Sequence, residues 1–340
     1  MDRIEFEALP GASFGKLMYA NPGKDGVAQL ETAADKLVQT FYAAHGFMLL
    51  RGLSVITADP QLLVRLSRLF GPEVENYRET LTASEQVHPV QAEILVVANR
   101  QPVNRLPPAR PDPPLTAEGA LPTQFPQRRG WHTDQSYRRP PPDISLFYAR
   151  APVPRGQGQT LYADGIAAYA ALPAALAKRV EGLHGMHVKP GSGRSEQAVR
   201  AGQTPQPLAP HEQPQLQPLV RAHPVTGARA LYLCEAGQLD WVGGPIAGLS
   251  AGLHGDGAAL VYELMTHYTQ PRFVYAHEWE PGDLVVYDNR NSIHAATWFD
   301  AERYGREMWR TTVWGNPGPE YAGEARSWIA KSANRAVDAR

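Results

Sequence analysis

A short polar segment, Gly130–Arg139, contains the first residues whose types suggest chemistry. It reads GWHTDQSYRR, so His132 and Asp134 stand two positions apart. In an extended chain, residues i and i+2 point to the same side, and an imidazole and a carboxylate on one side can both bind one metal ion. The pair is common by chance, and an ordinary polar strand is the alternative interpretation.

A third metal ligand could come from His294, far along the chain in the segment VVYDNRNSIHAAT. Two histidines and one carboxylate form the facial triad, which binds Fe(II) on one side and leaves positions open for substrate and oxygen. Only a fold can bring His294 to His132 and Asp134, because the sequence spacing alone does not relate them.

Two arginines near the C-terminal end, Arg306 and Arg310, are four positions apart in GREMWRTT. If this segment is a strand, both side chains point to the same face. Guanidinium groups are the preferred bidentate partners of carboxylates, so an inward-facing pair predicts an anionic ligand. A pair of surface arginines on an edge strand is the alternative.

Hydrophobic periodicity predicts the elements that must position these residues. Asp164 is a candidate N-cap of one helix, which Pro173 should interrupt. The predicted helices cover residues 28–44, 59–71, 164–180 and 255–270. The predicted strands cover residues 46–53, 92–99, 143–153, 183–190 and 306–315, with a hairpin over 219–233 that turns at Thr226 and Gly227, and two strands within 273–298 joined at Pro281–Asp283.

Two long segments interrupt this pattern. Residues 101–129 are crowded with proline, and residues 190–218 are rich in Gly, Gln and Pro. Loops of this length are usually functional or disordered, and we expect both to border the mouth of an active site; insertions without function are the alternative. Short strands dominate the second half, which predicts an antiparallel β-sandwich or barrel-like core flanked by helices from the N-terminal third.

The composition excludes several classes of protein. The 340 residues carry a net charge of −1, which gives no electrostatic footprint for nucleic acid. No apolar run is long enough for a membrane span, and the N-terminal residues do not resemble a signal peptide. The single cysteine, Cys234, excludes an internal disulfide and suits a reducing cytoplasm; we expect it to be a small packed residue.

Taken together and in this order, five segments resemble the taurine dioxygenase (TauD/TfdA-like) family of Fe(II)/2-oxoglutarate-dependent oxygenases. These segments are GWHTD, GQGQTLYADGIAAYAALP, HPVTGARALYL, PGDLVVYDNRNSIHAAT and REMWR. The resemblance spans roughly residues 27–315. It implies a single domain over residues 1–340, mainly β with flanking helices, around a double-stranded β-helix (jelly-roll, cupin-like) core.

The resemblance also implies roles for individual residues. His132, Asp134 and His294 would be the iron ligands. Arg306 would pair with the far carboxylate of 2-oxoglutarate, assisted by Thr160. The neighbouring arginine of the taurine enzyme contacts the anionic group of its substrate, and the match here is Arg310. The spacing from His294 to Arg306 is slightly longer than in that enzyme.

Two further residues are candidates for the substrate pocket. His88 lies in the part of the chain where the taurine enzyme has a substrate-binding histidine. Asn99 ends a predicted strand and could present its amide to the pocket. A plain strand-end asparagine is the alternative for Asn99.

The implied reaction uses O2 and 2-oxoglutarate to oxidise a C–H bond of a small, anionic organic substrate, with release of succinate and CO2. Asp134 occupies the position that related halogenases leave open for chloride, which favours hydroxylation. Three alternatives stay open: an oxygenase of the same family acting on an uncharged or zwitterionic metabolite, a manganese or zinc enzyme on a cupin-like barrel, and a non-catalytic barrel that binds iron or 2-oxoglutarate. The resemblance further suggests a homo-dimer or tetramer. The composition favours the cytoplasm and predicts no nucleic-acid or membrane partner.

Overall fold

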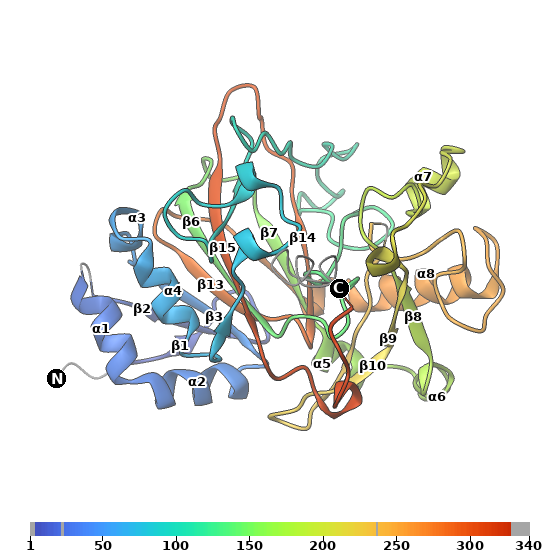
Figure 1. The fold of residues 1–340 in the computed structure, drawn as a ribbon, viewed down its shortest axis with the longest axis horizontal. Helices are drawn as coiled ribbons and strands as arrows, with labels where there is room; N and C mark the ends of the chain where they lie inside the picture. Colours follow the sequence, from blue (N-terminus) through green and yellow to red (C-terminus); the bar gives the residue numbers. More distant parts are fainter. Residues whose placement is uncertain (1–3, 22–23, 236, 328–340) are drawn as a thin grey trace, which may run out of the picture.

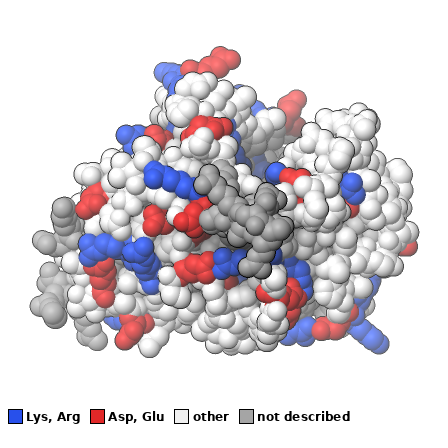
Figure 2. Space-filling view, viewed as in Figure 1, with Lys and Arg blue, Asp and Glu red and all other residues white. Residues whose placement is uncertain are grey.

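The computed structural model describes residues 4–21, 24–235 and 237–327. These residues form a mainly β molecule with helices on its outer faces (Figure 1). Within them, no helix is long and apolar enough to cross a bilayer. Acidic and basic side chains are interspersed over the face shown in Figure 2.

The larger sheet contains eight strands, which pair antiparallel except that β2 runs parallel to β3. Its order along the sheet is β1 (Glu7–Ala8), β2 (Lys16–Tyr19), β3 (Phe47–Arg51), β13 (Leu284–Asp288), β6 (Ile144–Ala151), β15 (Glu307–Trp314) and β4 (Glu73–Val74), with β5 (Leu95–Ala98) also paired to β15. This sheet therefore joins N-terminal strands to strands from the last quarter of the chain.

A smaller sheet of three antiparallel strands supplies the other half of the core. Its order is β12 (Val274–His277), β7 (Thr160–Asp164) and β14 (Ser292–Ala296). Two separate two-stranded sheets complete the strands. One pairs β8 (His184–His187) with β9 (Gln215–Pro218), and the other is the hairpin of β10 (Val220–Ala222) and β11 (Arg229–Leu231).

Alternation of side chains in the strands explains the layers. Met48 and Leu50 of β3 lie in one core with the N-terminal helices, whereas Phe47 and Leu49 lie in a second core with Tyr162 of β7. Successive side chains of a strand point to opposite faces, so the larger sheet is covered by helices on one face and by the smaller sheet on the other. The covering helices are α1 (Lys24–Thr32), α2 (Ala34–Ala43), α3 (Val55–Ala58) and α4 (Gln61–Ser67).

The outer face of the smaller sheet has its own helical cover. Leu161, Ala163, Ile293 and Ala295 point away from the larger sheet into a third core. The helices near this face are α5 (Gly165–Ala170), α6 (Ala174–Val180) and α8 (Asp256–Tyr268). The remaining short helices are α7 (Glu196–Arg200), η1 (Tyr77–Glu79), η2 (Ser84–Gln86), η3 (Pro210–Glu212), η4 (Pro271–Phe273) and η5 (Pro319–Tyr321).

Most elements predicted from periodicity are present. Asp164 caps α5 through the backbone N–H groups of Ile166 and Ala167, and a new helix begins after Pro173, as predicted. The hairpin turn has Gly227 at a φ of +70°, which glycine adopts without strain. Cys234 is buried, and burial raises the pKa of its thiol to about 11.

Four predictions need correction. The helix predicted over 28–44 is two helices, because the backbone at Ala33 leaves helical geometry although the hydrogen bonds continue across it. The helix predicted over 59–71 is shorter, covering only Gln61–Ser67. Residues 273–298 contain three strands, and Pro281–Asp283 joins strands of different sheets, since β12 pairs with β7 and β13 with β3 and β6. Residues 190–218 are not all loop, because they contain α7, η3 and β9.

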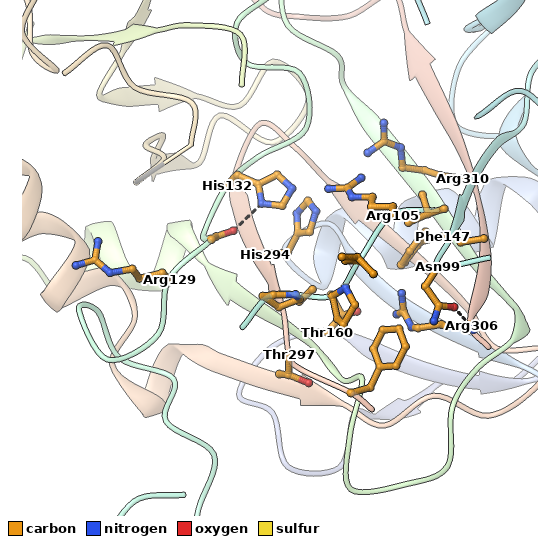
Figure 3. Close-up of a pocket in the computed structure, with 18 of the residues that line it drawn as sticks. Asn99, Arg105, Arg129, His132, Phe147, Thr160, His294, Thr297, Arg306 and Arg310 are labelled. Atoms are coloured by element: carbon orange, nitrogen blue, oxygen red, sulfur yellow. Dashed lines mark hydrogen bonds between the residues drawn. The ribbon is translucent and has the colours of Figure 1, made fainter. Parts of the chain in front are cut away.

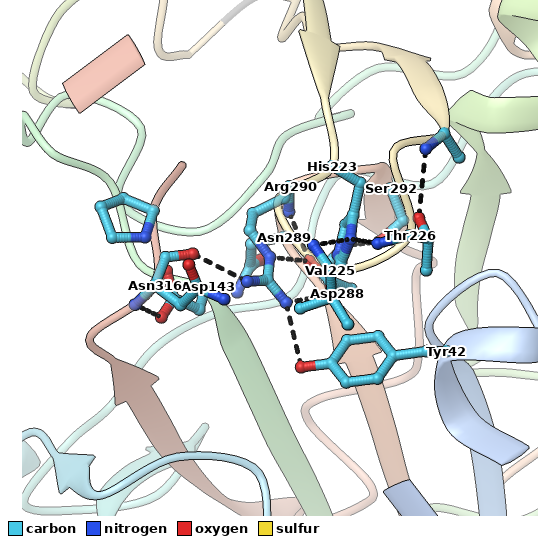
Figure 4. A network of polar contacts seen from close by, with 12 residues as sticks. Tyr42, Asp143, His223, Val225, Thr226, Asp288, Asn289, Arg290, Ser292 and Asn316 are labelled. Atoms are coloured by element: carbon cyan, nitrogen blue, oxygen red, sulfur yellow. Dashed lines mark hydrogen bonds and ion pairs between the residues drawn. The ribbon is translucent and has the colours of Figure 1, made fainter. Parts of the chain in front are cut away.

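The turn between β13 and β14 is fixed by a buried ionic network (Figure 4). The carboxylate of Asp288 accepts hydrogen bonds from Nε and Nη2 of Arg290 at 2.8 and 2.6 Å. It also accepts one from Nε2 of His223 at 2.9 Å, whose Nδ1 is taken by two backbone N–H groups. Burial acts to raise the pKa of Asp288, but the neighbouring Arg290 and His223 lower it below its usual value.

Replacing Asp288 with Asn should destabilise the fold strongly. The substitution leaves the guanidinium of Arg290 buried without its counter-charge, which typically costs about 3–5 kcal/mol. Urea unfolding should show this loss in the free energy of unfolding. The matched control is Glu263→Gln, which breaks an exposed pair with Arg179 and should cost at most about 1 kcal/mol. Equal losses in the two variants would contradict the prediction.

Candidate active site

The structure brings His132, Asp134 and His294 together. His132 lies beside β14, where its backbone N–H and carbonyl exchange hydrogen bonds with His294 at 2.9 and 2.7 Å. One candidate ligand atom from each of the three side chains lies within 4.8 Å of the others. The segment that carries His132 and Asp134 thus runs beside β14 at the edge of the smaller sheet. Both side chains point toward His294, as the i and i+2 spacing predicted.

The carboxylate of Asp134 is held in place by residues from the larger sheet. Its Oδ2 accepts hydrogen bonds from Tyr287 of β13 at 2.7 Å and from Ser145 of β6 at 2.8 Å. Its Oδ1 is in contact with the guanidinium of Arg310 of β15. The backbone N–H of Asp134 donates to the side-chain oxygen of Asn289 at 3.2 Å. The carboxylate therefore has one orientation, set by three strands of the larger sheet, while Asn289 of the turn after β13 holds its backbone.

The electrostatics of the three side chains suit a divalent metal ion. Burial acts to raise the pKa of Asp134, but Arg310 and the two histidines lower it below its usual value, so the carboxylate is ionised. Burial lowers the pKa of His132, and burial together with His132 lowers that of His294 to about 3, so both rings are neutral. Nδ1 of His294 is buried without a partner among the described residues. Two neutral imidazoles and one carboxylate are the donor set of the facial triad.

A cavity of about 340 Å³ opens beside His132 and His294 (Figure 3). Arg306 and Thr160 both line this cavity. This position is the one that their predicted role as partners of the far carboxylate of 2-oxoglutarate requires. Nε of Arg306 is buried without a hydrogen-bond partner among the described residues, and burial lowers the pKa of its guanidinium to about 10. Thr160 opens β7, and its hydroxyl accepts a hydrogen bond from the indole of Trp279 at 3.0 Å, which leaves its own proton free to donate.

A second cavity, of about 400 Å³, lies on the other side of the same centre. Arg105, His132 and Arg310 line both cavities, and Asp134 lines the second. Apolar and aromatic side chains form part of its wall, together with cationic and polar ones; these include Tyr77, Leu81, Leu95, Tyr137, Lys189, Pro190 and His211. The wall also includes Gln135, Gln238 and Glu212, so the second cavity could hold a molecule with an anionic end and a body of mixed polar and apolar character.

The two long segments border these cavities. Leu106, Pro107 and Pro108 of the proline-rich segment line the first cavity, and Pro190, His211 and Glu212 of the second segment line the other. The second segment is also anchored, because Glu196 of α7 is fully buried and pairs with Arg129, which lines the first cavity. Both segments therefore shape the site, as expected from the sequence.

The predicted substrate residues have different outcomes. Arg310 lines both cavities. Asn99 lines the first, but its amide bonds to the backbone of Tyr304 at 2.9 Å and of Arg306 at 2.7 Å, so it positions the approach to β15. His88 lines neither cavity. Its ring packs on Trp309 at a centroid distance of 4.9 Å, and its Nδ1 accepts two backbone hydrogen bonds.

Sequence reasoning missed Arg105. It stands in the proline-rich segment, and its guanidinium has no ion pair with the described residues. The residue as a whole is exposed, but its guanidinium lines both cavities, where partial loss of solvent and the neighbouring Arg310 lower its pKa. The only sequence signal for Arg105 was its position in residues 101–129, which were expected to border the mouth of the active site. Arg138, at the end of the segment that carries His132 and Asp134, is buried in an ion pair with Glu75 at 2.6 Å and lines the second cavity.

Comparison with known proteins places the chain in a family. The family model described as "Taurine catabolism dioxygenase TauD, TfdA family" matches residues 6–312. The chain belongs to the TauD/TfdA family. The resemblance inferred from the five sequence segments is thereby confirmed.

Individual relatives are more distant. The alpha-ketoglutarate-dependent 2,4-dichlorophenoxyacetate dioxygenase of Burkholderia sp. is 33% identical over 54% of this chain and 58% of its own length. Pentalenolactone F synthase of Streptomyces arenae is 30% identical over 51% of this chain and 58% of its own length. The alignments thus span less than two thirds of these relatives. Among solved structures, AAD-2 in complex with Mn(II) and N-oxalylglycine is 26% identical with a TM-score of 0.64, covering 92% of this chain and 98% of that one.

Removing the tyrosine hydroxyl from Asp134 should weaken metal binding by this TauD/TfdA-family chain. Tyr287→Phe deletes one of the donors that orient the carboxylate, and loss of such a group typically lowers metal affinity about 10- to 100-fold. Titration of metal-free protein with Mn(II), followed by electron paramagnetic resonance, measures this affinity.

Tyr148→Phe is the matched control for Tyr287→Phe. Tyr148 is equally buried, but its hydroxyl bonds to Thr57 at 2.8 Å, away from the three metal-binding candidates. Its replacement should leave Mn(II) affinity unchanged. Unchanged affinity in a folded Tyr287→Phe protein would show that the hydroxyl does not orient the carboxylate.

Proposed function

We propose that this protein is an Fe(II)- and 2-oxoglutarate-dependent dioxygenase that hydroxylates a small anionic organic substrate, using O2 and releasing succinate and CO2. The observation that carries the proposal is one cavity lined both by His132 and His294 of the three-residue cluster and by Arg306, whose guanidinium has no hydrogen-bond partner among the described residues. Bound Fe(II) would supply the oxidation chemistry. The chain's own residues hold the metal, anchor the cosubstrate and orient the substrate.

Arg306 and Thr160 are proposed to anchor the far carboxylate of 2-oxoglutarate. A buried guanidinium needs an anionic partner, and a planar carboxylate matches its geometry. The hydroxyl of Thr160 can donate to the same group, because Trp279 already donates to its oxygen. The AAD-2 structure, which contains Mn(II) and N-oxalylglycine together, supports a metal and an organic acid in this type of site.

Arg105 and Arg310 are proposed to bind the anionic group of the substrate. They lie on the boundary between the two cavities, beside His132. The second cavity, whose wall is partly apolar and largely polar, would then hold the rest of the substrate. The printed activity of the Burkholderia relative, on an aryloxyacetate, is consistent with an organic acid of this kind.

A second candidate is oxidation of an uncharged or zwitterionic metabolite. One observation favours it, because Arg310 is already paired with Asp134 and so has less need of a substrate anion. The similarity to pentalenolactone F synthase, named for a biosynthetic step, also supports this second candidate. The unpaired Arg105 favours the anionic substrate.

The finer features of the fold and its setting are also proposals. We infer that the two facing sheets form a double-stranded β-helix core within a single catalytic domain, with residues 101–129 and 190–218 as insertions. We further propose a cytoplasmic enzyme that forms a homo-dimer or tetramer and acts on a small molecule. The absence of disulfide potential in a chain with one cysteine fits the cytoplasm.

The decisive experiment is an anaerobic visible spectrum of the protein with Fe(II) and then 2-oxoglutarate. The wild type should develop a charge-transfer band, and His132→Ala should not. Arg306→Ala should require at least about tenfold more 2-oxoglutarate, because it loses a charge-assisted bidentate contact. Arg150→Ala, which breaks an exposed pair with Glu307, is the control and should match the wild type. Iron binding without any band in the wild type would overturn the proposal.

Arg105 should control affinity for an anionic substrate. In assays of succinate release with a panel of organic acids and sulfonates, Arg105→Ala should raise the KM of an accepted substrate about tenfold or more, since a charged hydrogen bond is lost. The KM for 2-oxoglutarate should change little, because Arg306 holds its far end. Arg155→Ala, at an exposed pair with Glu280, is the control. An unchanged substrate KM in Arg105→Ala would favour the uncharged substrate.

A further inference from the structure

A third, smaller cavity of about 180 Å³ lies beside the first and has no assigned role. Thr297 lines both, so the two cavities are neighbours. Two arginines, Arg110 and Arg128, line the small cavity. Its other lining residues are neutral, and include Gln159, Trp298 and several prolines and leucines. The lining therefore carries positive charge without an acidic side chain.

Arg128 is the unusual member of this lining. Its side chain belongs to a residue only 4% exposed, and its Nε donates to the carbonyl of Pro122 at 2.9 Å. It makes no ion pair with the described residues, and burial lowers the pKa of its guanidinium with no acidic group acting in the opposite direction. Burying a cation without a counter-charge is unfavourable unless a partner is supplied.

Other buried arginines of the chain show what is usual. Arg138 pairs with Glu75, Arg221 with Glu320 and Arg290 with Asp288, and the partly buried Arg310 pairs with Asp134. Arg306 has no acidic partner among the described residues, and it lines the cavity proposed for 2-oxoglutarate. Arg128 is likewise buried without an acidic partner among the described residues and lines a cavity. An anion from outside the chain could therefore pair with it there.

Arg110 adds a second positive charge to the same cavity. Its guanidinium lies over the ring of Trp298, with Cζ 4.8 Å from the centroid, and it has no ion pair with the described residues. The stacking fixes the plane of the guanidinium while its N–H groups stay available for an anion in that plane. The carboxylate of Glu278 is not part of the lining. It lies behind the wall, where it accepts hydrogen bonds from the amide of Gln159 at 2.7 Å and from the backbone N–H of Gly156 at 3.1 Å.

We propose that this cavity is an anion-binding site, in which Arg128 and Arg110 together hold a small oxyanion or a carboxylate group. The site is separate from the proposed 2-oxoglutarate and substrate sites and does not depend on the proposed function. The anion is either free in solution, such as inorganic phosphate, or the carboxylate of an organic acid such as succinate. Its small volume excludes a large ligand from lying wholly within it.

Calorimetric titration of metal-free protein with inorganic phosphate, at constant ionic strength, tests the site. Arg110→Gln should weaken phosphate binding about fivefold or more, because one charged contact is lost. Arg303→Gln is the matched control, since Arg303 is also an exposed arginine stacked on an aromatic ring, that of Tyr304, without an acidic partner. The control should bind phosphate as the wild type does.

Two further variants separate this site from the larger cavity. Arg306→Ala should retain phosphate binding, whereas Arg128→Gln should lose it. Because replacement of the buried Arg128 endangers folding, Arg110→Gln carries the test. No binding in the wild type, or binding lost in Arg306→Ala but intact in Arg110→Gln, would overturn the proposal.

Succinate distinguishes the two sources of the anion. Added to Arg306→Ala protein saturated with phosphate, succinate should displace the phosphate if the site takes the carboxylate of an organic acid. Phosphate that stays bound identifies a site for a free oxyanion. In either case the affinity for phosphate should fall in Arg110→Gln. Phosphate binding that is unchanged in Arg110→Gln would contradict the proposed anion site. The use of metal-free protein keeps this result independent of whether the chain is an oxygenase.

Discussion

The buried carboxylate of Asp134 is the group on which the arrangement of the site depends. An ionised carboxylate can be buried only where hydrogen bonds and positive charge compensate its lost hydration. Here the compensation comes from Tyr287, Ser145 and Arg310 of three adjacent strands of the larger sheet, while His294 belongs to the smaller sheet. The two sheets must therefore pack in one register, because a shift of one residue in any strand would turn its contributing side chain to the opposite face.

Because side chains alternate between the two faces of a strand, one strand can supply both a core residue and a site residue. In β13, Val286 packs against the N-terminal helices while Tyr287 reaches Asp134. In β7, Leu161 packs toward α8 while Thr160 opens into the first cavity. A strand buried on both faces can thus supply a core residue and a site residue at adjacent positions. The Asp288–Arg290 network then fixes the turn that carries Asn289 against the Asp134 backbone.

The sequence predicted those parts of the site that depend on local geometry. The i and i+2 spacing of His132 and Asp134, and the i and i+4 spacing of Arg306 and Arg310, follow from strand geometry once a strand is assumed. Contacts between residues far apart in the sequence could not be predicted from strand geometry. Such contacts decide that Asn99 bonds to the backbone around Arg306 and that His88 packs on Trp309 outside both cavities. They also bring Arg105 of an irregular segment to the centre, where no periodic signal exists.

Charge explains why the ligands of this centre should be anions. Arg105, Arg306 and Arg310 line the first cavity, and Asp134 is the carboxylate of the metal-binding cluster at their centre. A divalent metal ion on the histidines and Asp134 would increase the positive excess further. In a site of low dielectric, such an excess strongly favours the binding of negative groups. A dicarboxylate cosubstrate would remove part of it. Arg105, which forms no ion pair with the described residues, would leave a place for the negative group of a second molecule. The electrostatics therefore support the proposal of two anionic ligands in one centre, one at Arg306 and one where Arg105 and Arg310 meet.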